Sequence, residues 1–100
     1  MSAEAEQLVF VLLQRINVVR NEARFYLVTT GPSLLDPHAV FRTWGRMGGF
    51  QRSMVTPCQT AAEAERVAGK FIRRRLKRGY YLAQGTLPEA VAQDQPESAA

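Results

Sequence analysis

The first half of the chain is a series of short apolar segments separated by turn-forming residues. Aliphatic and β-branched side chains dominate the first segment, which is too short and too apolar for a surface helix. The later segments are rich in aromatic and β-branched residues, and successive side chains of a strand point to opposite faces, so Val40, Arg42 and Trp44 are expected on one side of the third segment. The predicted strands span residues 8–16, 24–30, 39–44 and 51–56. Three glycines among residues 45–49 predict a tight reversal, and Pro57 predicts the end of the fourth strand. The pattern therefore predicts an antiparallel meander.

A helical period replaces this alternation after residue 60. Thr60 and Glu63 match a capping box, in which the hydroxyl accepts a hydrogen bond from the third helical amide and the glutamate reaches back to the cap amide. Apolar residues then recur three and four positions apart, at Ala64, Val67, Ala68, Phe71, Ile72 and Leu76. Gly79 is placed to end the helix, which is expected from Ala61 to Arg78. The expected fold class is α+β, with a meander of about four strands packed against one main helix.

A chain of 100 residues has room for one small domain. We expect an N-terminal tail at residues 1–7, the folded domain at 8–83 and an acidic tail at 84–100. The last segment is rich in Ala, Gln, Pro and Ser, and has too few bulky apolar groups to offset the entropy of ordering it. It is therefore expected to be disordered.

The charge is concentrated in the middle of the chain. Thirteen Lys+Arg against nine Asp+Glu give a net charge of +4. All thirteen cations lie between Arg15 and Arg78 with only four acidic residues, so that segment carries 13 − 4 = +9. Such a charge attracts polyanions, of which nucleic acid is the commonest. The alternative is that the arginines only solvate a small domain.

Catalytic and metal-binding chemistry finds little support in the sequence. One histidine, His38, and one cysteine, Cys58, are too few for a His/Cys zinc site, so no metal and no cofactor are expected. We find no nucleophile, base or paired-carboxylate constellation, so neither enzyme activity nor a small-molecule substrate is expected. The apolar stretch from Leu8 to Leu13 is far shorter than the roughly 20 residues that span a bilayer, and no membrane association is expected. The lone cysteine favours a reducing, cytoplasmic location.

Several motifs occur in an order that resembles one known family. Trp44-Gly45-Arg46 lies at the end of a predicted strand and precedes a glycine-rich turn. An Asn-x-x-Arg-Phe-Tyr stretch occupies residues 21–26, Leu-Gln-Arg-Ile occupies 13–16, and Lys-Arg-Gly-Tyr follows the capped helix at 77–80. This set resembles the WGR domain, including its bacterial members, over Leu12 to Tyr81.

The resemblance implies an antiparallel sheet packed against a helix, without catalysis by the domain itself. In poly(ADP-ribose) polymerases this domain grips DNA near a strand end, and the signature tryptophan packs on the terminal nucleotide. It therefore implies that Trp44 stacks on nucleic acid. Nothing in this chain resembles the polymerase catalytic domain or the helical regulator that the signature arginine contacts there, so the resemblance does not extend a protein-contact role to Arg46.

The expected nucleic-acid site combines a flat ring with cations that can bind phosphates. Its residues are Arg42, Trp44, Gly45, Arg46 and Arg52 around the turn and Arg73, Arg74 and Lys77 on the helix. The alternatives are a core tryptophan and a solvated helix face. Phe50, at the tip of the turn, is either a second stacking wedge or folds back onto the sheet.

We therefore expect a DNA-binding module that prefers ends or nicks, with RNA as an open alternative ligand. The rival interpretation is a protein-interaction module without nucleic-acid binding. Its basic surface would meet an acidic protein or a second copy of the chain, with the apolar first strand at a sheet edge as a route of association.

Overall fold

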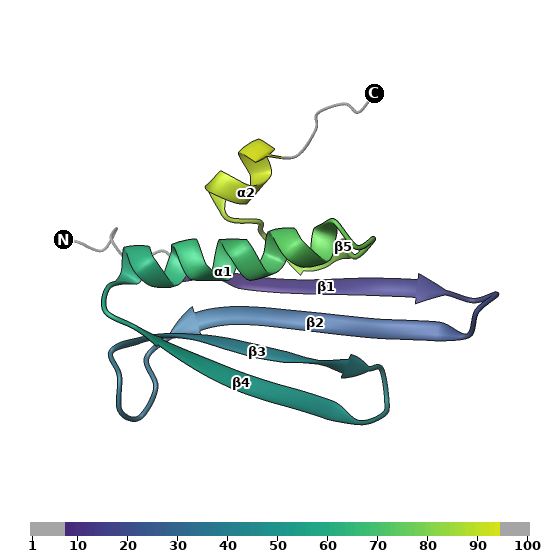
Figure 1. The fold of residues 1–100 in the computed structure, drawn as a ribbon, viewed down its shortest axis with the longest axis horizontal. Helices are drawn as coiled ribbons and strands as arrows, with labels where there is room; N and C mark the ends of the chain where they lie inside the picture. The colour runs from purple at the N-terminus through teal and green to yellow at the C-terminus, as the bar shows by residue number, and fades with distance from the viewer. Residues whose placement is uncertain (1–7, 95–100) are drawn as a thin grey trace.

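The computed structural model describes residues 8–94, which form a five-stranded antiparallel sheet with two helices (Figure 1). The strand order is β4-β3-β2-β1-β5. The elements are β1 (Phe10–Asn17), β2 (Glu22–Gly31), β3 (His38–Arg46), β4 (Gln51–Cys58), α1 (Ala61–Leu76), β5 (Tyr81–Gly85) and α2 (Glu89–Asp94). The first four strands form the expected meander, and α1 is the main helix packed on it. The α+β expectation is confirmed.

The hydrophobic core lies between one side of the sheet and α1. Val11 and Leu13 of β1 and Tyr26 and Val28 of β2 are buried on this side, as alternation along a strand requires. Ala64, Ala68 and Ile72 supply the buried stripe of α1 at helical spacing. We call this the helix side of the sheet and the opposite surface the far side.

Both ends of α1 are fixed by the residues that the sequence indicated. The Thr60 hydroxyl accepts a hydrogen bond from the Glu63 amide at 3.0 Å. The Glu63 carboxylate accepts one from the Gln59 amide at 2.7 Å, one residue before the expected cap amide. The helix ends at Leu76, two residues before the expected Arg78, where the Gly79 amide donates to the Leu76 carbonyl at 3.1 Å. Gly79 has φ +94°, a conformation that glycine adopts without strain.

Pro57 does not end the fourth strand, which continues to Cys58. The proline is paired with Ala39 of β3. This is permitted because β4 is an edge strand, whose outer side has no ladder for a backbone N–H to join. The edge position is a tertiary property that the local sequence does not contain.

Residues 84–94, within the tail that was expected to be disordered from residue 84, include the end of β5 and the helix α2. Gln84 and Gly85 end β5, which pairs with β1; the sheet therefore has five strands, and β1 is interior instead of being an edge. Val91 of α2 is fully buried, and a Cβ added at Gly69 of α1 would lie only 3.3 Å from its Cγ2 atom. Main-chain pairing and a few docked side chains thus order a segment of low apolar content. The remainder of both expected tails, residues 1–7 and 95–100, lies outside the described residues.

Replacing Val91 with alanine should lower the free energy of unfolding by about 2 kcal/mol, because two methyl groups leave a fully buried site. Chemical denaturation of the full chain measures the change. Leu34→Ala is the control, since Leu34 is fully exposed and its truncation should change stability by less than about 0.5 kcal/mol. An unchanged denaturation midpoint for Val91→Ala would contradict the docking of α2 on α1.

Candidate nucleic-acid interface

Three arginines and the single tryptophan gather on the helix side of β3 and β4. Positions 42, 44 and 46 are two residues apart and therefore lie on the same side of β3. Arg52 is paired with Trp44 across the β3–β4 hairpin and lies on that side too. Helix α1 packs on β2 and β3, whereas residues 51–55 of β4 are exposed. Figure 1 shows this hairpin extending beyond α1. We call Arg42, Trp44, Arg46 and Arg52 the Trp44 shelf.

Trp44 is half-buried, at the margin of the core. Its ring lies 5.9 Å from the Tyr26 ring between centroids, at an interplanar angle of 42°. It is packed against the buried cluster that Tyr26 belongs to. The indole is therefore fixed on one side by the core and reaches solvent at the shelf. The alternative of a core tryptophan describes one face of the ring, which packs on the buried cluster, but the side chain as a whole is not buried.

Arg42 packs between aromatic rings of the sheet and the helix. Its guanidinium carbon lies 5.3 Å from the Trp44 ring centroid and 3.8 Å from that of Phe71 in α1. One terminal nitrogen donates to the Met54 sulfur at 2.8 Å. Its Nε is shielded from solvent and has no hydrogen-bond partner within the described residues. Arg42 thus holds the indole by cation–π contact and retains an unsatisfied donor.

The glycine of the Trp-Gly-Arg motif is required by close backbone approach. A Cβ at Gly45 would overlap the carbonyl oxygen of Phe50 on the returning strand. Any side chain here would push apart the two strands that carry Trp44 and Arg52. Gly45 therefore shapes the hairpin, and its contribution to the site is steric.

Arg46 is hydrogen-bonded to Asn21, the first residue of the Asn-x-x-Arg-Phe-Tyr motif at residues 21–26. Its two terminal nitrogens donate to the Asn21 carbonyl at 3.0 Å and to the Asn21 side-chain oxygen at 3.4 Å. Asn21 has φ +55°, a left-handed conformation that asparagine tolerates better than most residues. The two motifs, twenty-five residues apart, are therefore two halves of one local structure.

A polar hollow opens beside this contact. Its lining residues are Arg15, Arg20, Asn21, Glu22, Arg24 and Arg46. Glu22 accepts a hydrogen bond from Arg15 at 2.7 Å and lies 3.5 Å from Arg24. The hydrogen bond from Arg15 lowers the pKa of Glu22, and the same bond raises the pKa of Arg15. One carboxylate thus faces several guanidinium groups, and the hollow keeps an excess of positive charge.

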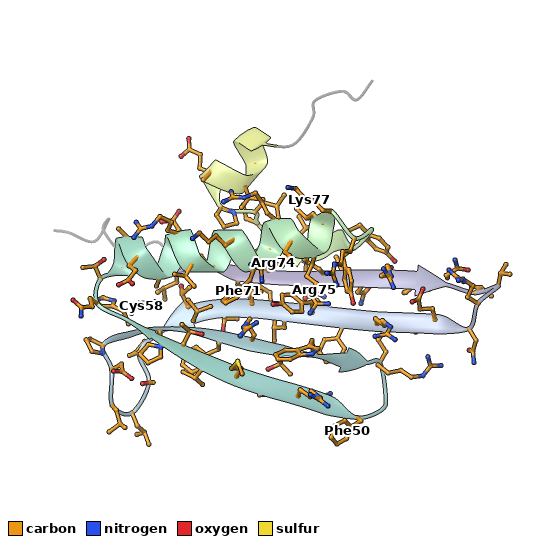
Figure 2. The ribbon with its side chains drawn as sticks, viewed as in Figure 1. Phe50, Cys58, Phe71, Arg74, Arg75 and Lys77 are labelled. Carbon is orange, nitrogen blue, oxygen red and sulfur yellow. The ribbon has the colours of Figure 1, made fainter. Side chains whose placement is uncertain are left out.

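The expected helix cations do not all face the shelf. Arg74 is exposed on α1, and Figure 2 shows Lys77 on the side of α1 opposite to β3 and β4. Arg73 lines a hollow between α1 and α2 together with Pro88 and Ala90. The structure brings Arg42, Trp44, Arg46 and Arg52 together, and leaves Arg73 and Lys77 outside this group.

Arg75 is a neighbour of the shelf that the expected site left out in favour of Arg73, Arg74 and Lys77. Its guanidinium carbon lies 4.3 Å from the Tyr26 ring centroid and 5.6 Å from that of Tyr80. Figure 2 shows it directed toward the sheet, unlike Lys77. Its position on the same helix face as Phe71, four residues earlier, was the available signal. It was hidden because five cations crowd residues 73–78.

Two further residues named in the sequence analysis, Phe50 and Cys58, are placed by the structure. Phe50 is 79% exposed at the hairpin tip and does not fold back onto the sheet (Figure 2). Cys58 is buried, and this burial raises the pKa of its thiol despite the adjacent start of α1.

No described helix is long and apolar enough to cross a membrane. Within residues 8–94, no group of three or more His, Cys, Asp or Glu residues is arranged to hold a metal ion.

An antiparallel sheet with one main helix, and a basic surface built around a half-buried tryptophan, defines a small α+β binding domain. The chain belongs to the WGR family, since the sequence model of the WGR domain matches residues 9–86. WGR domains are binding domains and are not catalytic in themselves. The match includes β5, which the sequence prediction had left outside the strands.

One curated relative is described as "Uncharacterized protein y4dW", from Sinorhizobium fredii (strain NBRC 101917 / NGR234). It is 32% identical to this chain over 68 residues, which are 68% of this chain and 33% of that protein. The chain therefore matches about a third of the length of this relative. No solved structure matches the chain significantly.

The Glu22 ion pair should make stability depend on pH. Because its folded pKa is lowered, the charged carboxylate stabilises the fold above the ordinary value of 4.5, and this contribution is lost as the pH falls toward the lowered value. Glu22→Gln should therefore be less stable than wild type at pH 7, and the difference should shrink in acid. Denaturation series across this pH range measure it. Glu65→Gln is the control, because no arginine within the described residues lies at ion-pair distance from Glu65.

Proposed function

We propose that the Trp44 shelf binds nucleic acid, with a preference for DNA ends or nicks. The observation that carries the proposal is the grouping of Trp44 with Arg42, Arg46 and Arg52 on the helix side of β3 and β4. None of these arginines has a carboxylate at ion-pair distance within the described residues. Cations without acidic partners are free to neutralise phosphates, and the membership in a family of binding domains supports the same conclusion.

The contacts of each residue in the Trp44 shelf indicate a different role in binding. Trp44 offers a supported apolar surface to an unstacked sugar or base, and such stacking contributes about 1–3 kcal/mol per base. Arg42 positions the indole through its contacts with Trp44 and Phe71. Arg46 and Arg52 are exposed and contact phosphates, for which the planar guanidinium gives bidentate hydrogen bonds.

The preference for ends follows from the geometry of stacking. Inside a closed duplex each base is covered by neighbours on both faces, so a ring cannot pack on it without unstacking energy. A terminal nucleotide, or one beside a nick, has a free face. Arg74, Arg73 and Lys77 then contribute to the positive field around the site and do not contact the same nucleotide.

Binding is measured by titrating the full chain with a short duplex at several salt concentrations. Trp44 is the only tryptophan, so its emission reports on stacking directly. We expect quenching by blunt or nicked duplex and weak competition by closed-circular DNA. Trp44→Leu keeps an apolar side chain beside Tyr26 but has no tryptophan emission, so its affinity and that of wild type are compared by the fluorescence anisotropy of a dye-labelled duplex. The variant should bind about tenfold or more weakly. Equal affinity of this variant and of wild type would exclude the stacking role.

A charge-matched pair of variants separates specific contacts from net charge. Arg52→Gln should lower the magnitude of the slope of log K against log salt by about 0.9, the loss of one phosphate contact. Arg66→Gln removes the same charge from the exposed surface near α2 and should change this slope little. Equal effects of the two substitutions would mean that only the overall charge attracts DNA. A ribonucleotide duplex of the same sequence, if bound more tightly, would identify RNA as the ligand.

A further inference from the structure

The far side of the sheet is apolar and is covered by neither helix. Register and alternation place one set of apolar residues on it: Phe10, Leu12, Ile16, Phe25, Leu27, Phe41, Val55 and Tyr81. Phe10 and Val55 are each 48% exposed, whereas Val11 and Val28 on the helix side are fully buried. The core accounts for one side of the sheet and leaves the other without packing partners.

Charge is absent from this side of the strands. Every charged residue in the five strands lies on the helix side, namely Arg15, Glu22, Arg24, Arg42, Arg46 and Arg52. The polar residues of the far side are uncharged, and two of them, Thr43 and Ser53, form a hydrogen bond with each other at 3.2 Å. The main-chain groups of the three inner strands are paired within the sheet. Burial of this side therefore leaves no charge unpaired, and further polar side chains on it, such as those of Gln14, Thr29 and Gln51, are uncharged.

The dimensions of the far side suit a stable interface. Five strands spaced about 4.8 Å apart and about eight residues long present a face of roughly 600 Å². A standard protein–protein interface buries about 800 Å² of accessible surface per partner. A side-chain-covered sheet of this size comes close to that value. A face of this size that exposes several large apolar side chains on a single chain typically marks an interaction site.

We propose that this face joins two copies of the chain, sheet against sheet, as a symmetric dimer. An acidic protein partner would be expected to meet cations, and the strands offer none on this side. A second copy brings the same neutral, apolar surface, which a twofold axis makes self-complementary. The arrangement also keeps the charged side chains of the strands, all of which lie on the helix side, on the outer surfaces of the dimer and away from the contact. The two sheets would pack about 10 Å apart.

The dimer extends the proposed function, because its effect on nucleic acid depends on the binding proposed for the Trp44 shelf. Each Trp44 shelf lies on the helix side, so two back-to-back copies present their shelves in opposite directions. One dimer would then hold two nucleic-acid ends at once. The association itself needs no nucleic acid, and it is tested without any.

Sedimentation equilibrium of the full chain at about 100 µM should give twice the 11.2 kDa mass of one chain. Leu27→Lys places a charge on the central strand of the interface, and Val55→Lys places one near its edge. Each should raise the dimer dissociation constant by roughly thirtyfold or more, since a buried unpaired cation opposes association. Circular dichroism and thermal unfolding verify that each variant is folded. Val55 is already 48% exposed, so its lysine variant is expected to fold even if Leu27→Lys does not.

Two matched controls carry the same chemical changes outside the far side. Leu34→Lys and Val19→Lys alter residues that are 100% and 94% exposed in loops, and both variants should remain dimers. A monomeric wild type, or dimers that persist in folded Leu27→Lys and Val55→Lys, would overturn the proposal. So would a monomer that buries this face only against a different protein. If the dimer forms as described but binds no duplex, the proposed function fails and the interface stands.

Discussion

The contact between Tyr26 and Trp44 across β2 and β3 is the interaction on which the rest of the site depends. It requires one strand register, in which Tyr26 is opposite Trp44 and Arg24 is opposite Arg46. With that register the tryptophan is supported by the core beneath α1, and Arg46 reaches Asn21. A slip of one residue would turn these side chains to the far side of the sheet. The fold and the candidate site therefore share one constraint.

Some arginines of this domain hold the fold together, and others are exposed at the surface where a ligand can reach them. Arg42 and Arg75 lie over aromatic rings between the sheet and α1, where the guanidinium serves as a flat packing element as well as a charge. Arg15 pairs with Glu22 and also donates to the Arg78 carbonyl at 2.7 Å, which ties β1 to the end of the helix. Arg52 makes no such contact with any residue that the structure describes, and it is exposed at the surface. A basic composition therefore overstates the number of cations free to meet a ligand.

The two sides of the sheet are chemically opposite because side chains alternate along each strand. Arginines and the tryptophan lie on the helix side, where Arg42 packs against Phe71 of α1 and Arg46 and Arg52 are exposed. The far side is neutral and apolar. In β1 apolar residues occupy both alternations, which is typical of a strand covered on both faces. Within one chain only one of these faces is covered, and this imbalance is what a second copy would remove.

The sequence by itself determined the local structure: the meander from alternation, α1 from its period and its Thr60 cap, the turn from its glycines, and Trp44 with its neighbouring arginines as the candidate site. Those features depend on residues close together in the chain. The tertiary structure alone decided that β5 pairs with β1, that Val91 docks on Gly69, that Arg75 belongs beside Tyr26 and that Arg73 does not face Trp44. Each of these depends on which surface a distant segment happens to meet. Composition identifies the charges, but only packing shows which side of the molecule they occupy.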